Sequence, residues 1–264
     1  MFGSGTCTPH PSRQTAAYGV EVQGHRWLMD SGTGTIQRLV HQGWSPFDLD
    51  GLFYTHLHLD HTGDLFPLLF LLRNSEGQHR TRTLPIYGPP GFAAFFQALM
   101  GVYGRWVRTP EYDITLHELG GEVRRVDLGP VVVDTFRVRH SNTAVGYRWT
   151  EMEAGGGRSL AFSGDAGEGA ELVDLFSGVD VAVVECSSPD DHPIPGHLTP
   201  SRVSVLVNQA KPKQVVLTHF YPPLANDPGP AVEQVSTQTG CPTFAAYDGM
   251  VVDVGVDLPV ENFR

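Results

Sequence analysis

The sequence predicts an α/β fold, and three observations lead to that prediction. Short apolar runs that read as strands alternate with stretches of helical spacing along the 264 residues. Glycine (30 residues) and proline (20) are abundant, as in a chain with many turns between short elements. Hydrophobic residues make up 41% of the chain, enough for a sizeable core. Neither repeats nor a clear linker interrupts it, so we expect one domain over residues 1–264.

The amino-terminal part predicts two strands and a helix after a glycine-rich loop. Residues 17–22 and 27–29 read as strands, and the second ends at Asp30. Ile36, Leu39 and Val40 have helical spacing and predict a helix that Gly43 ends. Asp30 is also placed to cap that helix near residue 33.

The middle of the chain predicts a second set of elements. Residues 65–72 read as an apolar helix and residues 84–87 as a strand. The aromatic residues from Phe92 to Phe96 predict a helix packed on the core, with a hydrophobic wall over a site as the alternative. Residues 114–119, 122–126 and 131–139 alternate with a period of two, which is consistent with strands of a second sheet.

The most informative stretch is residues 55–64, which read T-H-L-H-L-D-H-T-G-D after a buried strand at residues 52–54. Imidazole and carboxylate ligands suit zinc and neighbouring first-row metals. His56 and His58 are two residues apart, so extended backbone projects both to one side, where they can share one ion. Asp60 and His61 follow where the chain turns and can face a second ion. The alternative is a solvated polar loop with chance histidines.

This motif resembles that of the metallo-β-lactamase superfamily, and the resemblance extends over nearly the whole chain. It implies an αββα sandwich of two mixed β-sheets with helices outside, and metals at one edge where strand-end loops meet. It also implies a dinuclear metal centre and hydrolysis by a bridging hydroxide. Asp30-Ser31-Gly32 resembles the family's Asp-x-Gly turn, in which Asp30 would orient the metal loop.

The resemblance assigns further ligands to residues that follow predicted strands. His140 would complete a first metal site with His56 and His58, and His219 a second with Asp60 and His61. Asp165 would bridge both metals. Asp60 is also expected to accept a proton from the bridging water. Histidine-rich ligation favours two Zn²⁺ ions, with manganese or iron left open.

Two further residues resemble the ribonuclease Z branch, the tRNA 3′-processing endonucleases. Glu185 ends an apolar strand, and His197 follows in the phrase Gly-His-Leu-Thr. The resemblance implies that Glu185 orients His197, which would then give a proton to the leaving oxygen. The alternative is that Thr199 caps a helix at residues 200–209 and His197 packs before it.

One departure from that branch concerns the arm that grips tRNA. Only 24 residues separate His140 from Asp165, and two predicted strands with a loop at residues 155–157 fill them. The net charge of −11 also argues against a polynucleotide substrate unless a local basic patch exists. The arginines that could form such a patch are Arg73, Arg80, Arg82, Arg105 and Arg108.

Three functions therefore stay open. The first is a metal-dependent hydrolase of a small phosphodiester or ester, with an aromatic-rich neighbourhood at Phe92, Phe95, Phe96, Trp106 and Trp149. The second is a tRNA 3′-endonuclease that holds RNA by arginines. The third is a metal-binding sensor without turnover.

Composition also limits where in the cell we expect the protein. No run of eighteen apolar residues predicts a membrane span, and no signal peptide is visible. Cys7, Cys186 and Cys241 are far apart and odd in number, as expected of thiols in a reducing cytoplasm. The apolar residues of helices 33–43 and 64–72 could support a homodimer as well as a buried core.

Overall fold

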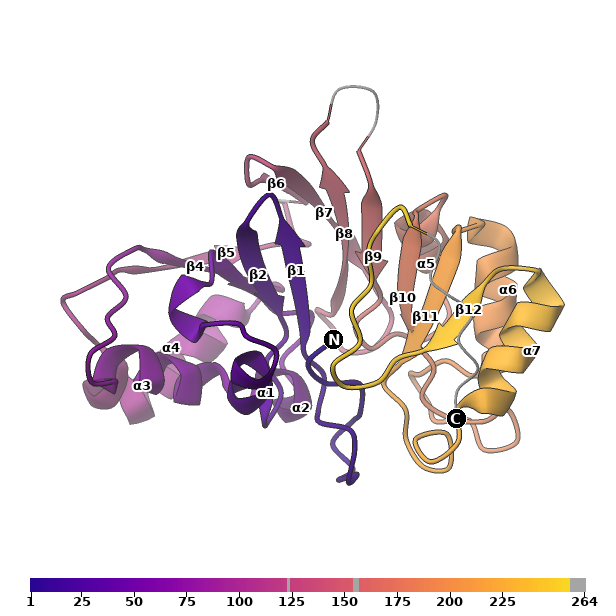
Figure 1. Cartoon of the computed structure of the whole chain (residues 1–264), viewed down its shortest axis with the longest axis horizontal. Helices are drawn as coiled ribbons and strands as arrows, with labels where there is room; N and C mark the ends of the chain where they lie inside the picture. The colour runs from indigo at the N-terminus through magenta and orange to yellow at the C-terminus, as the bar shows by residue number, and fades with distance from the viewer. Residues whose placement is uncertain (123, 154–156, 257–264) are drawn as a thin grey trace.

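Two β-sheets pack face to face with helices on their outer faces, as the computed structural model of residues 1–122, 124–153 and 157–256 shows (Figure 1). The first sheet has the order β1-β2-β3-β4-β5, and the second has the order β12-β11-β10-β9-β8-β7-β6. Each sheet contains both parallel and antiparallel pairs. This is the predicted αββα sandwich.

The first sheet and its helices occupy the amino-terminal part of the chain. Its strands are β1 (Tyr18–Val22), β2 (His25–Met29), β3 (Gly51–Phe53), β4 (Leu84–Gly88) and β5 (Ile114–Glu118). Its helical segments are α1 (Thr35–His41), η1 (Pro46–Asp48), α2 (Leu59–Thr62), α3 (Leu65–Asn74) and α4 (Phe92–Val107).

The second sheet follows in the chain, and three helices of the described residues cover it. Its strands are β6 (Arg125–Asp127), β7 (Val131–Arg137), β8 (Val145–Glu151), β9 (Ser159–Phe162), β10 (Val181–Glu185), β11 (Gln214–Thr218) and β12 (Thr243–Ala245). Its helices are α5 (Ala170–Phe176), α6 (Pro200–Ala210) and α7 (Gly229–Thr239).

In the part of the chain that the structure describes, three hydrophobic clusters fill the spaces between the layers. The central cluster joins the sheets, with Phe53 stacked on Tyr87 at 4.3 Å and in edge contact with Trp149. One outer cluster lies between the first sheet and its helices, and the other lies between the second sheet and its helices. Neighbouring residues of β3 serve different layers, because Leu52 and Phe53 point to opposite faces of a fully buried strand.

The structure corrects the expected place of residues 114–119. They were expected in the second sheet, but β5 pairs in parallel with β4 and forms the edge of the first sheet. Helix α4 connects these two strands, as a parallel pair requires. Their period-two pattern reflects an edge strand with one solvated face. Of the predicted strand at 122–126, β6 retains only its end, and Val123 lies outside the described residues.

Two further expectations are resolved by contacts. Asp30 does not cap α1, whose N-cap residue is Gly34 with no side-chain cap. The carboxylate of Asp64 instead accepts a hydrogen bond from the backbone N–H of Ile36 at the start of that helix.

Phe92 and Trp149 are core residues rather than walls of a site. Much of the predicted loop at 155–157 lies outside the described residues.

In the described part of the chain, no helix has both the length and the apolar character needed to span a membrane.

The central aromatic cluster provides a test of how strongly the two sheets depend on each other. Phe53→Ala removes a fully buried ring that contacts both sheets, so we expect the free energy of unfolding to fall by about 3–5 kcal/mol. Urea denaturation measures this change, and Val205→Ala on the exposed face of α6 is the control, expected within about 0.5 kcal/mol of the parent. A loss below about 1 kcal/mol for Phe53→Ala would contradict the assignment.

Candidate metal centre

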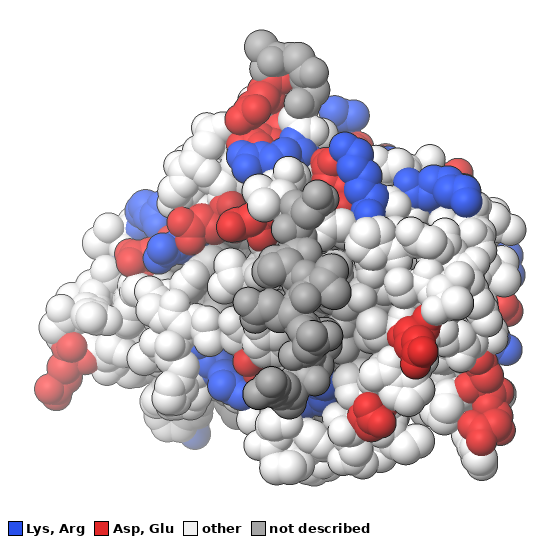
Figure 2. Space-filling model, turned by 45° about the vertical axis from the view of Figure 1, so that its right-hand side comes forward, with Lys and Arg blue, Asp and Glu red and all other residues white. Residues whose placement is uncertain are grey.

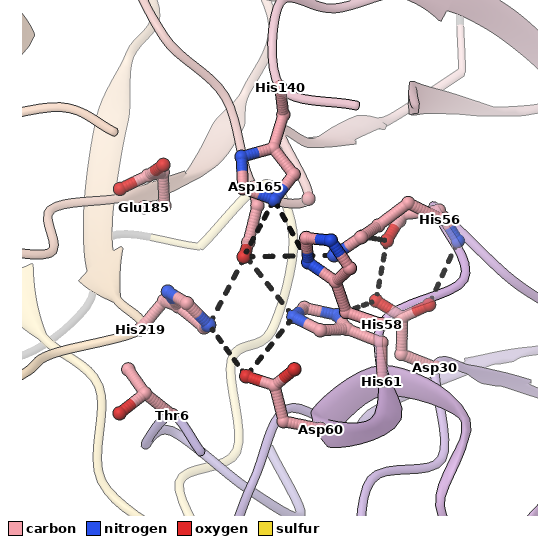
Figure 3. Close-up of polar contacts among 12 residues, drawn as sticks. Thr6, Asp30, His56, His58, Asp60, His61, His140, Asp165, Glu185 and His219 are labelled. Atoms are coloured by element: carbon pink, nitrogen blue, oxygen red, sulfur yellow. Dashed lines mark hydrogen bonds and ion pairs between the residues drawn. The ribbon is translucent and has the colours of Figure 1, made fainter. Parts of the chain in front are cut away.

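The seven predicted ligands lie together where several strands of both sheets end. Figure 3 shows their side chains directed toward one another. Strands β9 and β11 both run parallel to β10, so their carboxyl ends open on the same edge. Strand β3 of the first sheet delivers the motif of residues 55–64 to that edge. The ligands come after β3 (His56 and His58), from α2 (Asp60 and His61), after β7 (His140), after β9 (Asp165) and after β11 (His219).

The first group of donor atoms comprises His56, His58, His140 and one oxygen of Asp165. One atom of each lies within 4.8 Å of the others. Nε2 of His140 is 3.1 Å from Nδ1 of His58. Oδ2 of Asp165 is 3.6 Å from Nε2 of His140 and 3.8 Å from Nε2 of His56. Three imidazoles and one carboxylate oxygen thus surround one point.

The second group uses the other oxygen of the same carboxylate. Oδ1 of Asp165 is 3.2 Å from Nε2 of His61 and 3.2 Å from Nε2 of His219. Oδ2 of Asp60 is 3.6 Å from Nε2 of His219 and 4.0 Å from Nε2 of His61. Asp165 therefore directs one oxygen to each group, as a bridging ligand must.

These spacings fit metal ions. A tetrahedral Zn²⁺ with bonds of about 2.0–2.1 Å places its ligand atoms roughly 3.3 Å apart, close to the separations in both groups. Four of the donor atoms are also buried without a hydrogen bond in the described structure, namely Nε2 of His56, His61 and His219 and Oδ1 of Asp165. Buried polar atoms without partners are costly, and one cation at each group would together satisfy all four.

The opposite nitrogens of four of the histidines are held by hydrogen bonds. Nδ1 of His61 lies 2.8 Å from Asp30, and Nδ1 of His56 lies 3.1 Å from the Thr55 hydroxyl. Nδ1 of His140 faces the carbonyl of Gly196, and Nδ1 of His219 faces the hydroxyl of Ser187. Such bonds fix the ring orientation and leave the other nitrogen free to bind a metal.

Asp30 holds the metal-binding loop by more than its contact with His61. Its carboxylate also accepts the backbone N–H and the hydroxyl of Thr55, each at 2.8 Å. It is fully buried and has φ of 53°, a left-handed conformation that is uncommon outside glycine. His219 also has a left-handed backbone, with φ of 58°. Both strained residues lie at the candidate site, where the surrounding structure holds them.

Charges in the site suit a cation. Burial and the neighbouring imidazole of His61 lower the pKa of His56 well below its ordinary value, so His56 is neutral and has a free lone pair. Burial opposes ionisation of Asp165, but the imidazoles of His219 and His61 outweigh it and lower the pKa of that carboxyl well below its usual range. Burial likewise opposes the charge of His61, but Asp165 and Asp30 raise its pKa well above the ordinary value. A cation bound at Nε2 of His61, beside Asp165, would replace the proton on that nitrogen.

His197 and Glu185 lie beside the metal-binding groups and contact each other. Nδ1 of His197 is 2.9 Å from Oε1 of Glu185, which leaves Nε2 available to a substrate. Glu185 is fully buried and also accepts the backbone N–H groups of Ala166 and Leu198. Burial disfavours a charged His197, but the hydrogen bond with Glu185 outweighs it and raises the pKa of His197. Thr199 occupies the N-cap position of α6 but makes no side-chain cap there.

Three residues that the sequence did not single out also contribute to the site. The hydroxyl of Ser187 donates to Glu185 and lies within 3.2 Å of both His197 and His219. Thr55 joins Asp30 to His56, as described above. The ring of Tyr221 stands at 5.8 Å from that of His219. Ser187 and Tyr221 each follow a predicted strand-end residue by two positions, which is the only sequence signal they carry.

Comparisons with known proteins agree on a family. A family model described as "Beta-lactamase superfamily domain" matches residues 25–220. The chain is 25% identical over 273 residues to Ribonuclease BN of Cronobacter sakazakii, with 83% of this chain and 88% of that protein covered. It is 31% identical over 162 residues to Ribonuclease Z of Pyrococcus abyssi, with 61% and 50% covered. A metallo-beta-lactamase fold protein of Bacillus subtilis shares the fold, with a TM-score of 0.77, 20% identity, and 94% and 95% covered.

The support given by Asp30 can be tested without an assay of activity. Asp30→Asn keeps the shape of the side chain but removes its negative charge. One of the two oxygens that accept from Thr55 and His61 becomes an amide NH₂, which cannot accept. We expect metal affinity to fall by about 10- to 100-fold. Competition with a chromophoric chelator measures this affinity, and Asp174→Asn on the exposed face of α5 is the control. An unchanged affinity in Asp30→Asn would show that the metal loop keeps its geometry without this carboxylate.

Proposed function

Because the chain belongs to the metallo-β-lactamase superfamily of hydrolases, in its ribonuclease Z-like branch, we propose that it hydrolyses a small phosphodiester or ester with two bound divalent cations. The observation that carries the proposal is the arrangement around Asp165. Its two oxygens face two groups of donor atoms, and the pair His197–Glu185 lies beside them.

The roles of the residues follow from this arrangement. His56, His58 and His140 hold one cation, Asp60, His61 and His219 hold the other, and Asp165 contacts both. The histidine-rich donor set favours Zn²⁺. Bound cations would supply a water nucleophile at neutral pH and stabilise the negative charge that develops on the substrate. Asp60, which directs Oδ2 toward the second group, is placed to accept the proton of that water.

His197 supplies the proton that an alkoxide or phenoxide leaving group needs. Glu185 forms a hydrogen bond with Nδ1 of His197, so Nε2 of His197 is the nitrogen available to the substrate. The raised pKa of His197 keeps the imidazole protonated to higher pH than a free histidine, which suits a general acid. Ser187 contacts both Glu185 and His197 and restricts the ring further.

A small substrate is favoured over a polynucleotide by the surroundings of the arginines. Arg80 is buried and donates to three backbone carbonyls, so it is not free to bind phosphate. Arg82 is paired with Asp50 at 2.7 Å, and Arg73 donates to the carbonyl of Arg105. On the face in Figure 2, basic side chains are interspersed with acidic ones, and the net charge of the chain is −11.

The second candidate is a tRNA 3′-endonuclease, which the names of the curated relatives favour. Between His140 and Asp165, strands β8 and β9 form an antiparallel pair within the second sheet. This segment leaves little chain for an arm that grips RNA. A metal-binding sensor without turnover is the third candidate, and the presence of His197 beside the donor groups argues against it.

The role of His197 predicts a dependence on the leaving group. His197→Ala in the zinc-loaded protein should lower kcat for diphenyl phosphate by about 10²-fold or more, and lower it less for bis(p-nitrophenyl) phosphate. Phenolate needs a proton to leave, whereas p-nitrophenolate departs readily without one. Steady-state release of each phenol measures the effect. Removal of metal by a chelator should abolish both reactions.

His192→Ala is the matched control, because His192 is exposed and lies only five residues before His197. Equal losses on both phosphate substrates would contradict the role of His197 as an acid. Cleavage of p-nitrophenyl acetate alone, unaffected by the mutation, would place the activity on carboxylic esters.

Salt dependence separates the two candidate substrates. For a small diester we expect kcat/KM to change less than about threefold between 50 and 200 mM KCl, because one phosphate releases few counterions. Binding of an RNA through 6–10 phosphate contacts would weaken by about 10³–10⁵ over the same range. Parallel assays with bis(p-nitrophenyl) phosphate and a precursor tRNA provide the comparison. Efficient, steeply salt-dependent cleavage of the tRNA would favour the endonuclease.

A further inference from the structure

Tyr221 is a half-buried aromatic residue beside the candidate metal centre. The centroid of its ring is 6.0 Å from that of His197 and 5.8 Å from that of His219, and its plane stands at 72° and 82° to those two rings. Its backbone N–H donates to the carbonyl of Ser187 at 2.9 Å, and its own carbonyl accepts the N–H of Ala225 at 2.9 Å. The backbone of Tyr221 is therefore fixed relative to the site.

The hydroxyl of Tyr221 lies at a cavity in front of the second group of donor atoms. It is 3.3 Å from Sγ of Cys7, which is exposed. Cys7 lines a cavity of about 510 Å³ that extends to Asp60. Thr6 lines the same cavity, and Figure 3 shows Thr6 close to Asp60 and His219. The hydroxyl is thus next to an open space that a candidate metal ligand also borders.

Sγ of Cys7 is a weak partner for this hydroxyl. A thiol donates and accepts hydrogen bonds poorly, yet it is the partner that the described residues offer to the phenol. A non-bridging phosphoryl oxygen carries negative charge, and hydrogen bonds to charged oxygens are roughly twice as strong as neutral ones. The hydroxyl would therefore exchange the thiol for such an oxygen when one is bound at the centre.

The amino-terminal loop is held in place without this contact. The backbone N–H and the hydroxyl of Ser4 both donate to the carboxylate of Asp248, at 2.9 and 2.8 Å. The guanidinium of Arg13 donates to the carbonyl of Ala246 at 2.6 Å and to the hydroxyl of Ser4 at 2.8 Å. These charged hydrogen bonds are stronger than one between a thiol and a phenol, so the loop does not need the latter to keep its shape.

We propose that Tyr221 is a substrate-contacting residue, whose hydroxyl donates a hydrogen bond to a non-bridging oxygen of the phosphodiester at the metal centre. The inference rests on the proposed hydrolase function and adds a contact to it. The phenol keeps its proton throughout, so its part is to hold that oxygen and to stabilise the negative charge that grows on it during the reaction. Protonation of the leaving group stays with His197.

The alternative role for Tyr221 is to act only through His197, by limiting the movement of that imidazole. Nδ1 of His197 already lies 2.9 Å from Glu185 and 3.1 Å from the hydroxyl of Ser187. A ring contact at 6.0 Å adds little to these two hydrogen bonds. The two roles differ in a measurable way, because only a role through His197 depends on how much the leaving group needs a proton.

Tyr221→Phe removes the hydroxyl and keeps the ring. In the zinc-loaded protein we expect kcat to fall by about 10- to 100-fold, by a similar factor for bis(p-nitrophenyl) phosphate and for diphenyl phosphate, because both have the same non-bridging oxygens. Tyr247→Phe, at an exposed tyrosine, is the matched control and should equal the parent. A loss confined to diphenyl phosphate would assign Tyr221 to the orientation of His197 and overturn the inference.

Cys7→Ala removes the partner that the hydroxyl has before substrate binds. We expect kcat at or above that of the parent, since the hydroxyl no longer has to leave the thiol. A loss as large as that of Tyr221→Phe would show that the two residues form a structural clasp and would overturn the inference. Competition with a chromophoric chelator should give both variants the zinc affinity of the parent. A fall in zinc affinity that accounts for the lower kcat of Tyr221→Phe would also overturn it.

Calorimetric titration of the zinc-loaded protein with methylphosphonate tests the contact without turnover. We expect Tyr221→Phe to bind this anion about tenfold or more weakly than the parent, and Tyr247→Phe to bind it equally well. If the parent cleaves no diester, weaker binding by Tyr221→Phe would keep the contact and reject the proposed phosphodiesterase activity. Equal binding by Tyr221→Phe and the parent would overturn the inference, whether or not diesters are cleaved.

Discussion

The shared carboxylate of Asp165 is the constraint on which the arrangement of this protein depends. It is almost completely buried and is surrounded by imidazoles from both sheets. A buried charge is costly unless groups of opposite charge and hydrogen-bond donors surround it. The loop after β9 brings it into place, where Gly164 packs so closely on Thr55 that a Cβ would come within 2.8 Å of that side chain. The two sheets therefore have to meet at this point.

Hydrogen bonds connect the residues around Asp165 to the ends of the strands. Asp30 ties the end of β2 to the metal-binding loop, and Ser187 ties the end of β10 to His219. The candidate ligands are thus held by groups that follow three strands, β2, β3 and β10. Because the donor atoms are in place only when both sheets are packed, binding of metal and stability of the sandwich are linked. A change in the packing between the sheets alters the distances at the site.

The surroundings of the centre differ on its two sides. On the side of the second sheet lie Glu185, Ser187 and His197, which form a buried polar network. On the side of the first sheet, beyond Leu59, lie the aromatic walls between α3 and α4. A polar network of this kind holds side chains in place and can move protons.

The sequence by itself determined the residue types and their order along the chain. Periodicity predicted most strands and helices. The motif at residues 55–64 and the strand-end residues His140, Asp165 and His219 predicted a set of side chains that the structure brings together. Tertiary structure decided which strands become neighbours, so β5 joined the first sheet although its alternation suggested the second. It also decided that Arg80 is buried, and that Ser187 and Thr55 contact the ligands. These outcomes depend on contacts between residues far apart in the chain, which local pattern does not encode. A candidate ligand can be predicted from the apolar strand that precedes it in the sequence, but its hydrogen-bond partners are fixed only when both sheets pack together.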